Sequence, residues 1–144
     1  MPLNKTEIEW CTHTWNPVTG CLHGCEYCYA RSVARRFTLN PGDETGNVRV
    51  LGEPWLVDNS PGGDFDDAQW IRDPYPFGFD PTFHTYRLQD PIRHKKPAIV
   101  FVGSMCDLFG ESPLTDCVFT FVGAWIFISR RAHCGYSYQF GPRF

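Results

Sequence analysis

The middle of the chain, residues 38–97, most restricts what this sequence can fold into. It is rich in Pro, Gly, Asp and aromatic residues, as in NSPGGDFDD and DPYPFGFDP, and has no sustained helical or strand periodicity. So long a connection without regular structure is unusual in a compact domain and is typical of functional coverings or insertions. The aromatic side chains still need burial. We therefore expect a long irregular insertion that is partly ordered.

Regular structure is predicted on both sides of this insertion. Residues 8–15, IEWCTHTW, mix β-branched and aromatic side chains and predict a short strand that ends in a loop. Residues 28–37, CYARSVARRF, carry apolar residues at helical spacing and predict an amphipathic helix. The continuous apolar run AIVFVG, residues 98–103, is typical of a parallel strand that is covered on both faces. Together these elements predict a βαβ unit and an α/β fold.

Cysteine usage points to metal chemistry. The chain of 144 residues has seven cysteines, an odd number, and three of them lie in the stretch GCLHGCEYCY, residues 20–29. Such a cluster fits a thiolate metal site better than a disulfide framework in a reducing compartment. The other four are scattered, and we expect them to be buried and unreactive: Cys11, Cys106, Cys117 and Cys134.

The three clustered cysteines, Cys21, Cys25 and Cys28, form CxxxCxxC, which is one ligand short of a closed tetrahedral site. Three interpretations are open on spacing alone. A structural zinc site would recruit His13 or His23 as its fourth ligand, and structural zinc is the commonest use of short cysteine clusters. An iron–sulfur cluster would take Cys11 or Cys106 as its fourth ligand. In the third interpretation, one iron of a cluster is kept for a small molecule.

An aromatic residue, Tyr27, precedes the last of these cysteines, so the motif is CxxxCxφC. It resembles the signature of radical S-adenosylmethionine (SAM) enzymes. The resemblance implies that Cys21, Cys25 and Cys28 hold a 4Fe-4S cluster whose remaining iron binds SAM. It also implies that Tyr27 contacts SAM near its adenine.

Longer blocks carry a second resemblance. TEIEW, TWNPVTGC, CYA, PTFHTYRL and KKPAIVFVGSMCDLFGE, spread over residues 6–111, look like the phage Gp37/Gp68 family, a radical-SAM-like group. The implied fold is the N-terminal portion of a radical SAM-type (β/α) barrel. The implied chemistry is reductive cleavage of SAM to methionine and a 5′-deoxyadenosyl radical, which acts on an unknown substrate. An external electron donor is then required.

The resemblance also indicates cofactor contacts beyond the cysteines. In such barrels a polar segment after the second strand meets the SAM amino group, and VGSMCDLF occupies a comparable place. Gly103, Ser104, Met105 and Asp107 are therefore candidate SAM contacts. Ser104 and Asp107 are equally well explained as turn or helix-cap residues. His84 and Arg87, which lie in the block PTFHTYRL, have no assigned role.

Beyond Glu111 the family pattern stops. We divide the chain into a radical-SAM-like portion, residues 1–112, and an atypical hydrophobic tail, residues 113–144, which lacks the polar stripe of an amphipathic helix. One hypothesis is a truncated gene product with an altered reading frame after residue 112. Competence for turnover is then a question for experiment. The apolar run at 117–129 is too short for a membrane-spanning helix, which needs about 20 such residues.

Charge limits the partners that the sequence predicts. A net charge of −3 gives no broad positive field toward nucleic acid or anionic membranes. Basic groups at Arg31, Arg35, Arg36 and residues 93–96 are candidates for contact with a nucleic-acid substrate, but solvated surfaces explain them equally well. The start, MPLNKTEIEW, has no apolar core of a secretory signal, so we expect a cytoplasmic protein without membrane contact.

Overall fold

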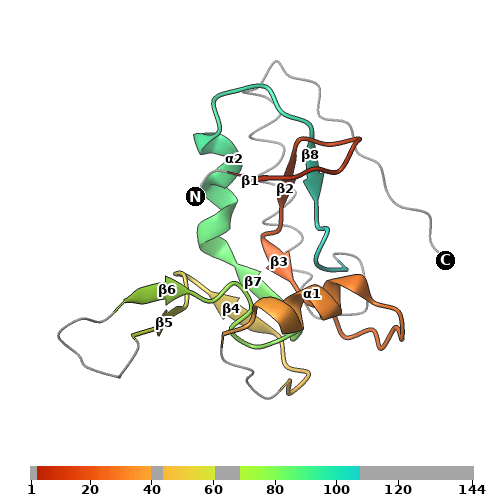
Figure 1. Cartoon of the computed structure of the whole chain (residues 1–144), viewed down its shortest axis with the longest axis vertical. Helices are drawn as coiled ribbons and strands as arrows, with labels where there is room; N and C mark the ends of the chain where they lie inside the picture. Colours follow the sequence, from red (N-terminus) through yellow and green to blue (C-terminus); the bar gives the residue numbers. More distant parts are fainter. Residues whose placement is uncertain (1–2, 40–43, 61–68, 108–144) are drawn as a thin grey trace.

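Three small sheets and two short α-helices make up the computed structural model, which describes residues 3–39, 44–60 and 69–107 (Figure 1). The first sheet has the strand order β1 (Asn4–Lys5), β2 (His13–Trp15), β8 (Val100–Val102). The second has the order β3 (Val18–Thr19), β7 (Thr82–His84), β4 (Arg49–Leu51). The third is the pair β5 (Leu56–Asp58) and β6 (Trp70–Arg72).

The two α-helices lie far apart in the sequence. Helix α1 (Tyr29–Phe37) follows the cysteines directly, and Cys28 is its N-cap residue. Strand β7 runs straight into the 3-10 helix η2 (Thr85–Gln89), which continues as α2 (Asp90–Arg93). Pro91 stands in the first turn of α2, where its missing N–H leaves no helical hydrogen bond unmade.

The predicted α/β fold, a partial radical SAM-type barrel, is wrong. Within the described ranges the sheets are mixed: β1–β2, β3–β7 and β5–β6 pair antiparallel, whereas β2–β8 and β4–β7 pair parallel, and no barrel closes. The physical reason lies at Asn16 and Pro17. These two residues separate β2 from β3 and direct the chain from one sheet into another, so successive strands do not extend one parallel sheet.

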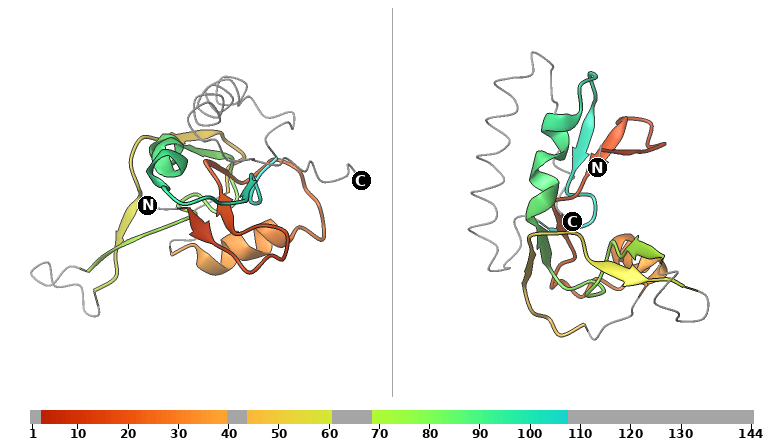
Figure 2. Two further views of the ribbon diagram at one scale, coloured as in Figure 1. Left: turned by 90° about the horizontal axis from the view of Figure 1, so that it is seen from above. Right: turned by 90° about the vertical axis from the view of Figure 1, so that its left-hand side faces the viewer.

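The predicted irregular insertion is also corrected by the structure. Strands β4 to β7, η2 and α2 all fall within residues 38–97. Phe79 and Phe83 are buried as expected, at 2% and 4% exposure, but Trp55 and Trp70 are 44% and 60% exposed. Both tryptophans lie on or beside the β5–β6 pair, which extends away from the other two sheets (Figure 2).

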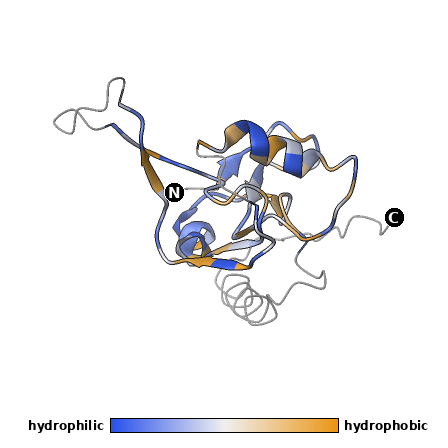
Figure 3. Ribbon diagram, turned by 90° about the horizontal axis from the view of Figure 1, so that it is seen from below, coloured by the Kyte–Doolittle hydropathy of each residue, from blue (hydrophilic) through white to orange (hydrophobic). Residues whose placement is uncertain are grey.

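Two of the predicted elements are confirmed. Helix α1 is present with Ala30 and Ala34 buried, although Phe37 is half exposed, and its ribbon carries both hydrophilic and hydrophobic residues (Figure 3). Strand β8 pairs in parallel with β2, as expected for residues 98–103. It is only partly buried, however, so it is not covered on both faces as predicted.

Among the described residues, the buried side chains form three small clusters and not one large core. Leu3 and Trp15 form the first cluster, and Val18 and Phe83 form another. The third joins Ala30 and Ala34 of α1 to Phe79 and Met105. We call this third group the α1 cluster. It fixes the helix that follows the cysteines against the segment that follows β8.

The predicted hydrophobic tail, residues 113–144, lies outside the described residues, as do Cys117 and Cys134. In the part of the chain that the structure describes, no helix is long and apolar enough to cross a membrane.

Candidate functional site

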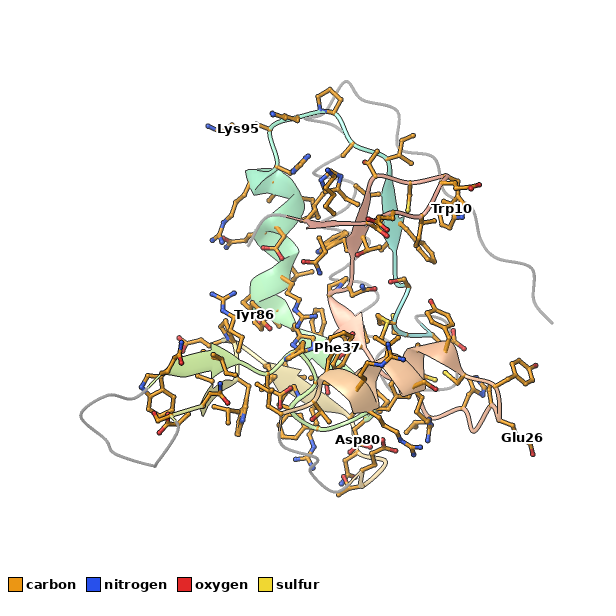
Figure 4. The ribbon with its side chains drawn as sticks, in the orientation of Figure 1. Trp10, Glu26, Phe37, Asp80, Tyr86 and Lys95 are labelled. Atoms are coloured by element: carbon orange, nitrogen blue, oxygen red, sulfur yellow. The ribbon has the colours of Figure 1, made fainter. Side chains whose placement is uncertain are left out.

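The three cysteines lie on one loop, residues 21–28, which we call the cysteine loop. None of these residues belongs to a helix or strand. The loop begins after Gly20 and ends at Cys28, whose Sγ accepts a hydrogen bond from the backbone N–H of Arg31 at 3.4 Å. Glu26 lies at its outer tip, far from the sheets (Figure 4). The loop is therefore anchored at both ends and open to solvent between them.

The cysteine loop lies beside residues 103–107, the segment that follows β8. Gly20 donates its N–H to the Met105 carbonyl at 2.8 Å and forms a parallel bridge with Cys106. In the loop itself, His23 Nε2 lies 3.2 Å from Asp107 Oδ2. The structure thus brings together the two segments that contain the three cysteines, His23, Cys106 and the candidate SAM contacts, whereas His13 and Cys11 lie outside both.

The thiols themselves are not equally placed. Cys21 and Cys28 pack against the α1 cluster, whereas Cys25 is exposed. Burial raises the pKa of Cys21 above its ordinary value, and the nearby Cys28 adds to this effect. Among the described residues, no three His, Cys, Asp or Glu side chains are close enough together to hold a metal ion.

The candidates for a fourth protein ligand differ in position. His23 lies within the cysteine loop, whereas His13 stacks edge-on against His94 at 4.6 Å in the first sheet. Cys11 is buried, as predicted. Cys106 packs against Val18 and Phe83. Burial raises the pKa of Cys106 strongly, and the charges of Asp107 and Cys21 raise it further. The parallel bridge between Gly20 and Cys106 places Cys106 next to the start of the cysteine loop.

The predicted SAM contacts have definite surroundings. Tyr27 is 88% exposed on the cysteine loop. Gly103 has a positive φ of 74° and donates its N–H to the backbone carbonyl of Trp15 at 3.0 Å. Both features shape the turn after β8. Met105 is buried in the α1 cluster. The carbonyl oxygen of Ser104 accepts a hydrogen bond from the Tyr29 hydroxyl at the start of α1.

Asn16 is a residue that the sequence analysis missed. Its side-chain oxygen accepts hydrogen bonds from Ser104 Oγ at 3.1 Å and from the Met105 N–H at 3.2 Å. Its backbone oxygen accepts one from Arg87 at 3.0 Å. Asn16 therefore fixes the 103–107 segment. The available signal was its position in TWNPVTGC, between a predicted strand and the cysteines.

The basic side chains of α1 contact the protein itself. Arg31 donates to the backbone oxygen of His23 at 3.1 Å and lies 3.5 Å from Glu44. Arg35 lies 3.8 Å from the same carboxylate. Arg31 Nε is buried and has no hydrogen-bond partner among the described residues. Because a buried donor without a partner costs free energy, an acceptor on a bound group at this position would be favourable.

His84 is the centre of a buried polar network. The side chain is fully buried, with Nε2 2.9 Å from Thr19 Oγ1 and Nδ1 3.3 Å from the Tyr86 hydroxyl. Arg87 donates to the same hydroxyl at 3.2 Å. Burial, together with a smaller effect of the Arg87 charge, lowers the pKa of His84 to about 2. The imidazole is therefore neutral, with one nitrogen donating and the other accepting.

This network predicts acid sensitivity. The unfolded chain binds a proton at His84 below a pH of about 6.5, but the folded chain does not, so the free energy of unfolding falls as the pH falls. We expect a loss of about 2 kcal/mol between pH 7 and pH 5, measured by urea denaturation. His84→Gln should flatten this dependence, whereas His23→Gln should keep it. An unchanged slope in His84→Gln would show that other groups cause it.

Fold and site together define a small mixed-sheet protein with a cysteine loop held against the end of a parallel strand. The chain belongs to the DUF5131 family, described as a protein of unknown function, which matches residues 5–126. No curated protein and no solved structure matches the chain.

Proposed function

We propose that the protein is an iron–sulfur protein in which Cys21, Cys25 and Cys28 hold a 4Fe-4S cluster that binds SAM. The observation that carries the proposal is the cysteine loop itself, three thiols in CxxxCxφC spacing on one unpaired loop beside residues 103–107. The proposal does not depend on a barrel. Its chemistry follows from the donor set, because thiolates are the protein ligands of iron–sulfur clusters.

The residues present fit such a cluster in two respects. Cys21 and Cys28 already share one packing surface, and Cys25 lies on the same loop, in which the hydrogen bonds between backbone groups are few. Binding would draw Cys25 toward the other two. In addition, the unpaired Arg31 Nε is a buried donor close enough to Cys21 to influence its pKa. Hydrogen bonds and charge near the sulfurs tune a cluster's reduction potential.

When bound, the cluster would supply reductive cleavage of SAM to methionine and a 5′-deoxyadenosyl radical, with an electron from an external donor. The chain's own residues hold and orient the ligands. Arg31 ties the cysteine loop to α1 through the His23 carbonyl, and Asn16 fixes Ser104 and Met105. Tyr27 is exposed and accessible to an adenine.

The alternative is a non-catalytic zinc protein that uses the same cysteines. His23 favours it, because an imidazole within the cysteine loop is a ready fourth ligand. All five described cysteines are free of disulfides, which suits either metal and supports our proposal of a cytoplasmic, reducing location.

Anaerobic reconstitution with iron and sulfide tests the proposal. We expect about four irons per chain, as a 4Fe-4S cluster requires. Electron paramagnetic resonance of the reduced protein should change on addition of SAM, and 5′-deoxyadenosine should form with a strong reductant. A stoichiometric zinc site that survives competition by iron would favour the alternative. A complete cluster whose spectrum does not change on addition of SAM would contradict SAM binding and favour a role in electron transfer or sensing.

A further inference from the structure

A cavity of about 250 Å³ lies next to the candidate site, and Asn16 is one of the residues that line it. Residues that bear on its chemistry come from three parts of the chain: Asn16, Thr19, Arg72, Tyr75, Tyr86 and Arg87. The volume is near the lower end of small-molecule sites, which begin at about 300 Å³. The cavity therefore suits a small molecule better than a macromolecule.

Contacts link this cavity to the cysteine loop. Tyr75 lines the cavity and also packs against the α1 cluster, where Cys21 and Cys28 pack. Burial raises the pKa of Tyr75. The Arg87 charge lowers this pKa by a smaller amount, and Tyr29 raises it slightly. Tyr29 donates in turn to the Ser104 carbonyl. A molecule in the cavity would be separated from the 103–107 segment by the side chain of Asn16, which lines the cavity and accepts hydrogen bonds from Ser104 and Met105.

The charged side chains of the cavity wall differ in how many hydrogen-bond partners they have. Arg87 donates to Asn16 and to the Tyr86 hydroxyl, over whose ring its guanidinium lies. The Asp73 carboxylate accepts the N–H groups of Leu39 and Tyr75 at 3.0 and 2.8 Å. Arg72 is an exposed residue of β6 whose backbone pairs with Leu56 of β5, but its side chain has no hydrogen-bond or ion-pair partner among the described residues.

The Arg72 guanidinium, which has no partner among the described residues, favours binding of an oxyanion. Its planar donors match the oxygens of a carboxylate or a phosphate in pairs. The second cavity arginine, Arg87, adds positive potential while it stays held by protein acceptors. The wall also carries the acidic residues Asp73 and Asp90. The oxygens of Asp73 are engaged by backbone donors, so an anion bound at Arg72 does not have to displace that carboxylate.

We propose that this cavity is the substrate pocket and that it takes a small molecule bearing a carboxylate or phosphate, bound by Arg72. Its role as a substrate pocket depends on the proposed SAM chemistry, but oxyanion binding does not. Asn16 is the structural connection between the two sites, since one residue holds Arg87 on the pocket side and Ser104 on the other.

Binding is tested on the full chain without metal, with inorganic phosphate and acetate as probes. Nuclear magnetic resonance of the tryptophan indoles reports on the cavity, because Trp15 lines it and its Nε1 donates to the Arg87 carbonyl. We expect one probe or both to shift the Trp15 indole signal in a saturable way. Arg72→Gln should weaken that binding at least about tenfold.

The matched control is Arg36→Gln, which removes the same charge from the exposed last turn of α1. It should leave the dissociation constant within about twofold, because Arg36 does not line the cavity and cannot bond to the probe there, and salt weakens the effect of an exposed charge. Arg72→Lys, which keeps the charge but not the paired donors, should bind with intermediate strength. No saturable shift with either probe, or equal losses in the Arg72→Gln and Arg36→Gln variants, would overturn the proposal.

The two proposals fail separately. If the protein binds only zinc, and the Arg72→Gln variant binds the oxyanion probes more weakly than the unaltered protein, the cavity is a ligand site and the SAM chemistry is wrong. If the cluster assembles and responds to SAM while neither probe binds, the pocket proposal is wrong and the function stands.

Discussion

Cys25→Ser should abolish iron incorporation and leave the fold intact. Cys25 is exposed and packs against none of the described buried clusters, so its replacement removes a ligand and no core contact. Cys21→Ser and Cys28→Ser should also lose the iron. Because both of these thiols pack against the α1 cluster, each change should cost some stability as well. Iron and sulfide analysis after anaerobic reconstitution, together with urea denaturation of the metal-free proteins, separates the two effects.

The matched controls are the other described cysteines. Cys11→Ser and Cys106→Ser should keep the full iron content once it is corrected for folded protein, because the proposal leaves one iron without a protein ligand. Loss of iron in Cys106→Ser would indicate a cluster with four protein thiolates and no site for SAM. Full iron in Cys25→Ser would contradict the proposal itself.

Local sequence patterns predicted the structure well where a helix or strand was long enough to show its periodicity. Helix α1 extends over nine residues, so its apolar spacing completes more than two turns. The strands within residues 38–97 have only three residues each, too few for an alternating pattern. Val50 and Leu56 are also more than half exposed in their strands, which reverses the usual relation between hydropathy and burial.

The predicted barrel rested on the resemblance, and topology overturned it. The parallel contact between β2 and β8 agrees with a βαβ unit, but β7 inserts from the middle of the chain and pairs with both β3 and β4. Such pairings join residues that are far apart in the sequence, such as Val18 and Phe83. Local propensity carries no information about them.

The candidate site was predictable only in part. The cysteines and the residues after β8 were identifiable from motifs, and the structure places them side by side. Arg72 and Tyr75 were not identifiable, because a polar or aromatic residue in an aperiodic segment has no pattern that marks a binding role. Asn16 had only its position in TWNPVTGC as a signal. Their significance comes from contacts across the fold, as when Asn16 meets both Arg87 and Ser104.

Gly20→Ala should destabilise the protein by about 2 to 5 kcal/mol. The residue has a φ of +81°, which costs a non-glycine residue about 1–2 kcal/mol. A Cβ there would lie 2.4 Å from the Phe79 carbonyl oxygen and 2.5 Å from that of Asp80. Both are backbone atoms, so relief requires a shift of the chain, and overpacking of this kind costs about 1–3 kcal/mol more. Urea denaturation of the metal-free protein measures the total.

Gly24→Ala is the control, because it lies in the cysteine loop with no atom within 4 Å of the added Cβ. Its free energy of unfolding should change by less than about 0.5 kcal/mol. Gly20 also donates to Met105, so strain at this position moves the loop relative to residues 103–107. Gly20→Ala should therefore incorporate less iron per folded chain than Gly24→Ala. Equal stability and equal iron in the two variants would mean that the close contact with Phe79 and Asp80 does not exist in solution.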